Sequence, residues 1–327
     1  MKRFLHFSMA LCLSVLPALA VAQAERSYPQ KAIKIIVPFP PGGTSDILGR
    51  VLSERLSDAW GQPVIVENRG GGGGSIGMDA VRKASPDGYT LALANQFIVT
   101  TSVLNKSVSF DVERDFEGVA LVATTPLVLI ANPSVKAANL RELTDLLRSN
   151  PKKFAYASCS LGSPLHFAGE EYKFLAKVSM LHSPYRGCAP AVVDVIAGQV
   201  QLGVVTLGSA LPHVKSGKLK AIATTGAQRA SAAPEIPTFR ESGVQGLESY
   251  ELDSWYGILA PAGTPPEVLN VLTPEVMKIM QQPDVQTKLS AAGFDRLIGD
   301  GKQLVKIIND DFSNFRRIAR VAHISLE

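Results

Sequence analysis

Residues Ile33 to Asp46 read IKIIVPFPPGGTSD, which predicts a strand that ends in a glycine-rich turn and opens into a helix. The apolar run at 33–37 has the length and β-branched content of a buried strand, and apolar residues recur at helical spacing after Asp46. Such a turn leaves main-chain N–H groups and the positive end of a helix dipole facing outward, which suits an anion such as a carboxylate. The segment therefore predicts an anion site. The alternative is a plain tight turn with Thr44 or Ser45 as N-cap. Asp46 could orient the loop or bind an amino or hydroxyl group of a ligand.

The N-terminus predicts export. Met1–Arg3 is a short basic segment, an apolar stretch follows to Leu19, and small residues then offer A-x-A cleavage sites, of which the one after Ala24 is favoured. This stretch is too short to anchor the chain in a membrane, and no other reaches the roughly 18 uninterrupted apolar residues of a spanning helix. We expect residues 1–24 to be a signal peptide whose removal leaves a soluble exported protein.

Composition argues against several functions. Loss of Lys2 and Arg3 takes Lys+Arg from 33 to 31 against 29 acidic residues, a net charge of +2, and no dense basic run stands out. Aromatic residues make up 7% of the chain, so neither charge nor stacking favours nucleic acid. The histidines after the signal lack zinc or iron spacing, and we expect no metal and no cofactor.

Short strands alternate with helices, which predicts an α/β fold with parallel sheets flanked by helices. The strands expected are 33–37, 64–67, 89–94, 127–131, 154–157, 180–184, 200–206 and 219–224. After residue 261 the pattern is helical to the end. Two lobes are expected at this length, with crossings near 131–133 and 224–233. Lobe 1 would comprise 25–132 and 226–327, and lobe 2 would comprise 133–225.

Two turns in the middle of the chain resemble the first one in chemistry. Residues 157–166 read ASCSLGSPLH, with Ser163 as the expected N-cap and Pro164 at the first helical position. Residues 184–194 read PYRGCAPAVVD, in which Ala189 is a poor cap and Arg186 could pair with a carboxylate. Both turns are predicted to present anion-binding groups.

A hydrolase is the main enzymatic alternative. It would use Ser158, Cys159 or Ser160 as nucleophile and His166 as base. No G-x-S-x-G surrounds these residues, and the sequence indicates no orienting acid. The tract Gly72–Gly77 formally matches G-x-G-x-x-G, but it follows the second strand and lacks the acid that a ribose would need, so a flexible rim loop is favoured over a dinucleotide site.

The two cysteines of the mature chain, Cys159 and Cys188, lie in two of these turns. An oxidising compartment invites a disulfide between an even pair, and neighbouring segments make the bond geometrically plausible. Two buried free thiols are the alternative.

Several stretches occur together in a fixed order along the chain. They are Tyr28-Pro29, Ile35–Asp46, Val66–Arg69, Ser85–Leu91, Gly162-Ser163 with His166, Pro184–Gly187 with Ala189-Pro190, and Trp255–Gly257 with Ala260–Pro265. In this arrangement the chain resembles the Bug receptors, periplasmic solute-binding proteins of tripartite tricarboxylate transporters, over nearly all of its mature length.

The resemblance implies a two-lobed periplasmic-binding-protein fold, each lobe a mostly parallel sheet flanked by helices, with a ligand cleft between the lobes. It implies a monomer that binds a small carboxylate through loops of both lobes, performs no chemistry, and delivers the ligand to membrane transporter subunits. A ligand-sensing module without a transport role is the remaining alternative.

The ligand-binding residues carried over onto this chain lie in three loops. They are Phe39, Gly42, Gly43, Thr44 and Asp46 in the first lobe, and Ser158, Gly162, Ser163, His166, Arg186 and Gly187 in the second. Asn95 and Thr206 join them because both end strands on the expected cleft side. The chain departs from the family at Gly70-Gly71, where the family has Pro-Gly, and at Cys159 and Cys188, where the family has smaller residues. A disulfide between Cys159 and Cys188 would pre-order the second-lobe loops.

Overall fold

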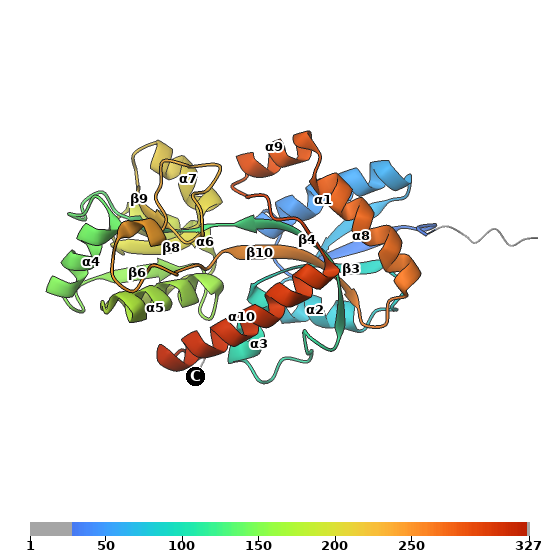
Figure 1. The fold of residues 1–327 in the computed structure, drawn as a ribbon, viewed down its shortest axis with the longest axis horizontal. Helices are drawn as coiled ribbons and strands as arrows, with labels where there is room; N and C mark the ends of the chain where they lie inside the picture. The colour runs from blue at the N-terminus through green and yellow to red at the C-terminus, as the bar shows by residue number, and fades with distance from the viewer. Residues whose placement is uncertain (1–27, 326–327) are drawn as a thin grey trace, which may run out of the picture.

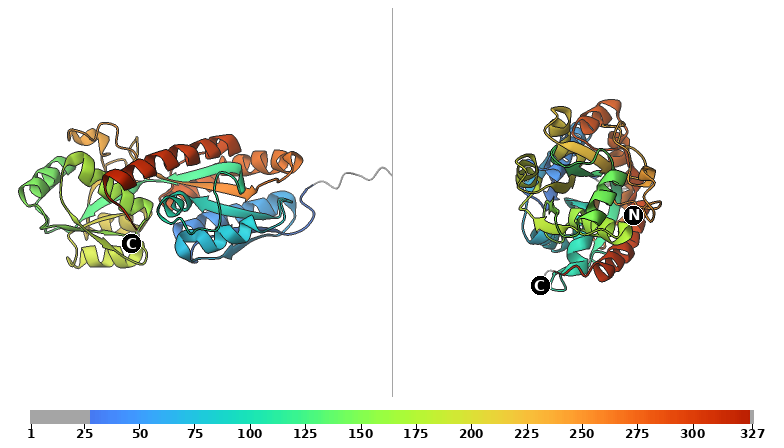
Figure 2. Two further views of the ribbon diagram at one scale, coloured as in Figure 1. Left: turned by 90° about the horizontal axis from the view of Figure 1, so that it is seen from below. Right: turned by 90° about the vertical axis from the view of Figure 1, so that its left-hand side faces the viewer.

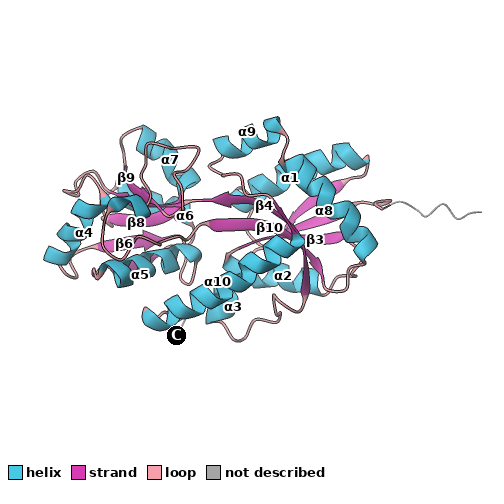
Figure 3. Ribbon diagram, in the orientation of Figure 1, coloured by secondary structure: helices cyan, strands magenta, loops and turns pink. Residues whose placement is uncertain are grey.

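The computed structural model describes residues 28–325, which form two lobes side by side (Figure 1), each built on one mixed sheet with helices packed on it (Figure 3). The strand order is β11-β4-β10-β3-β1-β2 in the first lobe and β7-β6-β8-β5-β9 in the second. The predicted signal peptide lies outside the described residues.

The first lobe contains both the beginning and the end of the described chain. Its strands are β1 (Ile33–Val37), β2 (Val64–Asn68), β3 (Thr90–Asn95), β4 (Phe116–Thr125), β10 (Ser254–Pro261) and β11 (Gly299–Asp300). Its helices are α1 (Thr44–Trp60), η1 (Gly72–Gly74), α2 (Ser75–Arg82), α3 (Phe97–Leu104), α8 (Pro266–Met280), α9 (Pro283–Ala291) and α10 (Gly301–Val321).

The second lobe is formed by the middle of the chain. Its strands are β5 (Leu127–Ala131), β6 (Ala155–Ser158), β7 (Leu181–Pro184), β8 (Leu202–Thr206) and β9 (Lys220–Thr224). Its helices are α4 (Leu140–Ser149), α5 (Pro164–Ala176), α6 (Cys188–Ile196), α7 (Leu207–Lys215) and the short η2 (Arg240–Ser242). Each strand predicted from the sequence is present, with its ends shifted by at most two residues.

The predicted two-lobed α/β architecture is confirmed, but the sheets are mixed rather than mostly parallel. In the first sheet β1 pairs in parallel with β2 and β3, while β10 pairs antiparallel with both β3 and β4. In the second, β6 pairs in parallel with β7 and β8, while β5 is antiparallel to β8 and β9. The antiparallel pairs arise because β4, β5 and β10 belong to the segments that connect the lobes.

The lobe boundaries differ from those predicted. Pro126 divides one long apolar stretch into β4, in the first sheet, and β5, which lies between β8 and β9 in the second. Proline has no N–H, so it interrupts the ladder where the chain changes sheets. The first crossing is therefore at Pro126 rather than after residue 132.

The return crossing also lies later than predicted. Phe239 stacks on Tyr250 and packs against Tyr172 of α5, so residues 226–252 cover the second lobe instead of belonging to the first. The chain crosses back at Asp253, immediately before β10.

Helix α10 spans both lobes (Figure 2). It begins with a capping box at Asp300 and Gln303 and packs on β4 and α3. Its C-terminal half reaches α5, where Phe315 packs against Phe167 with ring centroids 4.9 Å apart and Arg317 pairs with the buried Glu171. The helix therefore connects the first lobe to the helix that carries a candidate ligand loop.

Candidate functional site

In the first lobe, the carboxyl ends of three parallel strands face the second lobe. Thr125 and Ser254 are paired at the end of β4 that enters the second lobe, and Asn95 pairs with Tyr256 next to them. Because β1 and β2 run parallel to β3, their carboxyl ends lie on the same side.

The second lobe presents the carboxyl ends of its own parallel strands in return. Leu127, the first residue of β5 after the crossing, pairs with Thr206 at the end of β8. Ser158 pairs with Val204 and with Pro184, which brings the ends of β6 and β7 to the same edge. The loops after six strands therefore meet at one boundary, the place where α/β sheets bind ligands.

Helix N-termini follow these strand ends. Within residues 28–325, no side chain caps the first amides of α1 and α6. The first amide of α3, at Phe97, donates to Asn95 Oδ1 (3.1 Å), and that of α7, at Leu207, donates to the Pro126 carbonyl (3.0 Å). Asp46 is the sole acid in the first turns of these four helices and α5. The partial positive charge of several helix N-termini is thus directed at the boundary, and few acidic side chains neutralise it. This arrangement favours an anion at the boundary.

Asp46 folds the first-lobe turn rather than facing the boundary. Its side chain is 4% exposed, and Oδ2 accepts hydrogen bonds from the Gly42 N–H (2.9 Å) and from Arg50 Nε (3.0 Å). Burial alone would raise the pKa of Asp46, but the hydrogen bonds from Arg50, Gly42 and Asn68 together hold it below the usual range. Of the two roles considered for Asp46, the structure supports orientation of the loop, and it also commits the Gly42 amide.

The amides that follow Gly42 are open. Gly43 is exposed, occupies the N-cap position with φ −83°, and a Cβ added there would meet nothing closer than the Pro40 carbonyl oxygen at 3.8 Å. No side chain of the described residues caps the amides of this first turn. Asn95 donates to Ser45 Oγ (3.2 Å) and Phe39 packs on Phe97, so these residues support the turn from beneath.

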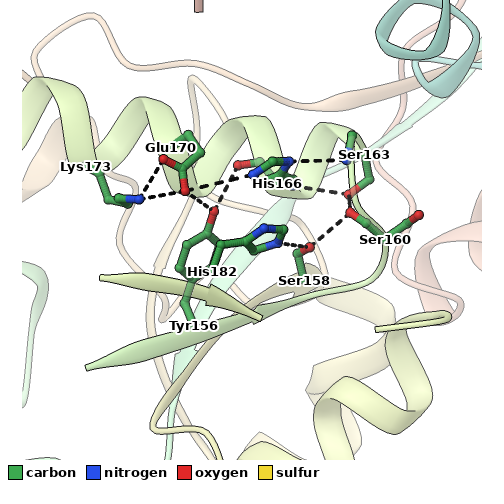
Figure 4. A network of polar contacts seen from close by, with 9 residues as sticks. Tyr156, Ser158, Ser160, Ser163, His166, Glu170, Lys173 and His182 are labelled. Atoms are coloured by element: carbon green, nitrogen blue, oxygen red, sulfur yellow. Dashed lines mark hydrogen bonds and ion pairs between the residues drawn. The ribbon is translucent and has the colours of Figure 1, made fainter. Parts of the chain in front are cut away.

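The second-lobe loop between β6 and α5 is held by a buried polar network (Figure 4). Ser163 is the predicted N-cap, and its Oγ accepts from the His166 N–H at 3.2 Å. The Gly162 N–H donates to His166 Nδ1 at 3.2 Å. His182 stacks on His166 with ring centroids 3.8 Å apart and bonds through Nε2 to Ser158 Oγ at 2.7 Å. His166 is therefore a support of this loop, with its Nδ1 already occupied.

Both histidines of the stack are neutral. Burial, assisted by Lys173, lowers the pKa of His166 to about 4, and burial together with His166 lowers the pKa of His182 to about 3. Glu170 lies at the far side of the network, where it accepts from the Tyr156 hydroxyl (2.7 Å) and from Lys173 Nζ (2.7 Å). A neutral His166 can accept the Gly162 hydrogen bond, which a doubly protonated imidazolium cannot.

We expect His166 to make stability depend on pH. Its folded pKa lies below its unfolded value, so the folded state loses stability as pH falls from about 6.5 towards 4. A shift of this size corresponds to roughly 3 kcal/mol once the pH reaches about 4. Urea unfolding of the wild type and of His166→Gln at several pH values measures it: the stability difference between them should shrink over this range.

His213→Gln is the comparison variant, because His213 lies outside the buried network and its removal leaves the His166–His182 stack intact. A wild-type advantage over His166→Gln that stays constant from pH 7 to 4 contradicts this account.

The third loop joins the second through main-chain and covalent bonds. Cys159 and Cys188 form a disulfide with Cα atoms 4.4 Å apart. The Gly187 N–H donates to the Cys159 carbonyl (2.7 Å), and the Tyr185 N–H to the Ser158 carbonyl (2.9 Å). The pairing left open by the sequence is thus present. Helix α6 begins at Cys188 with Gly187 as its cap, instead of at Pro190 after Ala189 as predicted, because Gly187 takes a φ of 112° that suits glycine.

Arg186 remains the free charge of this loop. Its side chain is exposed and makes no hydrogen bond or ion pair with residues 28–325. Thr206 lies at the N-cap of α7, with its hydroxyl bonded to Ser209 Oγ at 2.7 Å. The structure therefore brings the predicted residues of both lobes to one boundary, but commits the side chains of Asp46, Asn95, Ser158, Ser163 and His166 to holding the loops.

Sequence reasoning missed the support beneath the second-lobe loop, namely Tyr156, Glu170, Lys173 and His182. Tyr156 and His182 occupy paired positions on neighbouring strands, and their rings lie 4.9 Å apart. Their contact could be predicted only from the register between these strands, which the sequence does not supply.

The geometry does not support nucleophilic catalysis. Ser158 is 0% exposed, Cys159 is in the disulfide, and Ser160 Oγ bonds to the Leu161 carbonyl. The glycine tract also has a structural role, since Thr101 Oγ1 donates to the Gly73 carbonyl (3.0 Å) and a Cβ on Gly73 would lie 2.6 Å from that hydroxyl.

Residues 48–324 match the family described as tripartite tricarboxylate transporter family receptor. The chain belongs to this family. Protein BugT of Bordetella pertussis is 33% identical over 304 residues, covering 92% of each chain. The family is one of solute-binding receptors, so this receptor is not an enzyme.

Solved structures agree with this assignment. A protein described as a periplasmic transporter is 35% identical with a TM-score of 0.80, covering 92% of the receptor and 100% of that chain. An R. palustris protein with adipate is 29% identical (TM-score 0.82; 91% and 99% covered). MatC from Rhodopseudomonas palustris with bound malate is 26% identical (TM-score 0.76; 89% and 99% covered).

No helix within residues 28–325 is long and apolar enough to cross a membrane. Nor do three or more His, Cys, Asp or Glu side chains in that range gather where they could hold a metal ion.

Proposed function

We propose that the receptor captures a small carboxylate between its lobes in the periplasm and delivers it to the membrane subunits of a tripartite transporter. The observation that carries this proposal is the meeting of strand ends and uncapped helix N-termini from both lobes at one boundary. The adipate and malate in the two related structures support a carboxylate as the ligand class.

Each lobe supplies part of the hydrogen-bond donors for the carboxylate. The first lobe offers the amides of the Gly43 turn, and the second offers the amides at the start of α6 together with Arg186. An anion that contacts both sets favours the closed arrangement, because each lobe alone provides only part of the binding free energy. Release to a transporter then requires the lobes to separate.

A thermal-shift panel tests the ligand class. We expect one or more acids from a panel of dicarboxylates, tricarboxylates, amino acids, aromatic acids and nicotinate to raise the unfolding midpoint. A ligand present at about 100 times its dissociation constant should add about 2.7 kcal/mol of stability. The corresponding amides, which lack the charge, should give no shift.

Uptake in cells separates transport from sensing. Deletion of the gene for the receptor should abolish uptake of the acid found by the panel, and supplying it again should restore uptake. A receptor that binds the acid while uptake survives its deletion would be a sensing module. A panel in which no acid shifts the midpoint would contradict carboxylate binding itself.

A further inference from the structure

A short segment of the first lobe, residues 292–295, touches the start of α7 in the second lobe. A Cβ added to Gly208, the second residue of α7, would lie 2.6 Å from the Ala292 carbonyl oxygen. A Cβ added to Gly293 would lie 2.7 Å from the Gly208 Cα and 2.9 Å from the Gly208 nitrogen. The two glycines therefore bring the main chains of both lobes into direct contact, at a separation that leaves no room for a side chain.

Both sides of this glycine contact are fixed to the strand that crosses between the lobes. In the first lobe, the Thr125 hydroxyl donates to the Gly293 carbonyl (2.9 Å), and Asp295 exchanges two main-chain hydrogen bonds with the residue before Thr125 (2.8 and 3.1 Å). In the second lobe, the Leu207 N–H donates to the Pro126 carbonyl (3.0 Å). The contact is thus tethered within a few residues of the crossing, where a rotation of the lobes displaces atoms least.

A further contact between the lobes and a cavity lie next to the glycine contact. Asp295 accepts hydrogen bonds from the main-chain N–H (2.9 Å) and the hydroxyl of Ser231, which belongs to the second lobe. A cavity of about 440 Å³ is lined from both lobes, by Ser231 and by Gln286, Thr287, Ser290, Phe294 and Arg296. This space allows the angle between the lobes to change without a clash beside the contact.

We infer that the contact between Gly208 and Gly293 is the pivot about which the two lobes turn. Main chains without side chains can slide over each other, whereas interlocked side chains have to separate and repack before two surfaces can move. The inference rests on the proposed function in one respect, because closure around a ligand is the use that this motion would have.

Gly208→Ala tests the pivot in the ligand-free receptor. Alanine favours a helix more than glycine does, so the change should not harm α7 itself. The new Cβ has to move about 0.8 Å, the difference between 2.6 Å and an ordinary contact of 3.4 Å with the Ala292 oxygen. Spin labels at Asp58→Cys and Val193→Cys, exposed positions in opposite lobes, should report a change of about 2 Å or more in their mean distance. Lys215→Ala, an exposed change in the same helix, is the control and should leave the distance unchanged.

Thr125→Val tests the same contact from the first lobe. Valine has nearly the shape of threonine but cannot donate to the Gly293 carbonyl, so the segment 292–295 should loosen and the distribution of interlobe distances should broaden. Thr287→Val is the matched control, because it removes a hydroxyl that bonds to the Pro283 carbonyl in α9 (2.8 Å), away from the glycine contact. Its distance distribution should match that of the wild type.

Ligand affinity provides a second measurement. With adipate and malate as probes in calorimetry, Gly208→Ala should bind about tenfold more weakly than the wild type, a change within the usual range for coupling between distant sites. The loss is expected because a displaced pivot makes the closed arrangement harder to reach.

The outcomes distinguish the pivot from the proposed function. An unchanged mean distance in a folded Gly208→Ala receptor overturns the pivot, whether or not a ligand binds. If Gly208→Ala does not fold, equal distance distributions for Thr125→Val and Thr287→Val overturn it. A distance that shifts as expected, in a receptor whose wild type binds neither the probes nor any acid of the panel, supports the pivot and contradicts the proposed function.

Discussion

Reduction of the Cys159–Cys188 disulfide should lower the free energy of unfolding by about 3–4 kcal/mol and weaken carboxylate binding. The bond joins residues 29 positions apart, and a closed loop of that length restricts the unfolded chain by about this free energy. Urea unfolding with and without dithiothreitol measures the stability term.

We expect weaker carboxylate binding after reduction because the disulfide joins two candidate ligand loops. Cys159 directly follows β6, and Cys188 is the first residue of α6, so the bond couples the two second-lobe loops at the lobe boundary. Without it, binding has to order these residues at a cost of about 1–2 kcal/mol each, and we expect affinity to fall roughly tenfold. Calorimetry on the oxidised and reduced protein measures the difference.

A double variant, Cys159→Ser with Cys188→Ser, provides the control. It should match the reduced wild type in stability and affinity, and dithiothreitol should not change it further. Equal unfolding midpoints for oxidised and reduced wild type would contradict the stability prediction, and equal dissociation constants would show that the remaining contacts order these loops alone.

Gly43→Val should reduce carboxylate affinity by more than about 100-fold, with little loss of stability. The loss corresponds to roughly 3 kcal/mol or more, which is the scale of two hydrogen bonds to a charged group. The expectation rests on a side chain that shields the open first-turn amides of α1. A strained backbone is not the reason, because Gly43 has a φ of −83° and room for a Cβ. Calorimetry measures affinity and urea unfolding measures stability.

Two further variants separate shielding from strain. Gly43→Ala adds only the Cβ, so its affinity should lie between those of glycine and valine. Gly42→Val should instead destabilise the fold, because Gly42 has a φ of 83° that a β-branched residue adopts with strain. Unchanged affinity in Gly43→Val would remove this turn from the binding site.

Much of the fold follows from local pattern. The segment 33–46 determined a strand, a turn and a helix because its apolar spacing and glycines act over short range, and the same holds for the turns at 158–166 and 184–188. Helix α3, which was not predicted, shows where local pattern fails. Helix α3 has the sequence FIVTTSVL, rich in β-branched residues that favour strands, yet it is helical where it packs on α10.

The sequence by itself determined which loops follow strands and open helices, since glycine, proline and capping residues fix turns locally. Only the tertiary structure decided how those loops are supported. The register between β6 and β7 pairs Tyr156 with His182, and the packing of α5 against β6 places His166 on the His182 ring. The crossing at Pro126 assigns β5 to the second lobe. These outcomes depend on residues distant in sequence and become definite only when the sheets assemble.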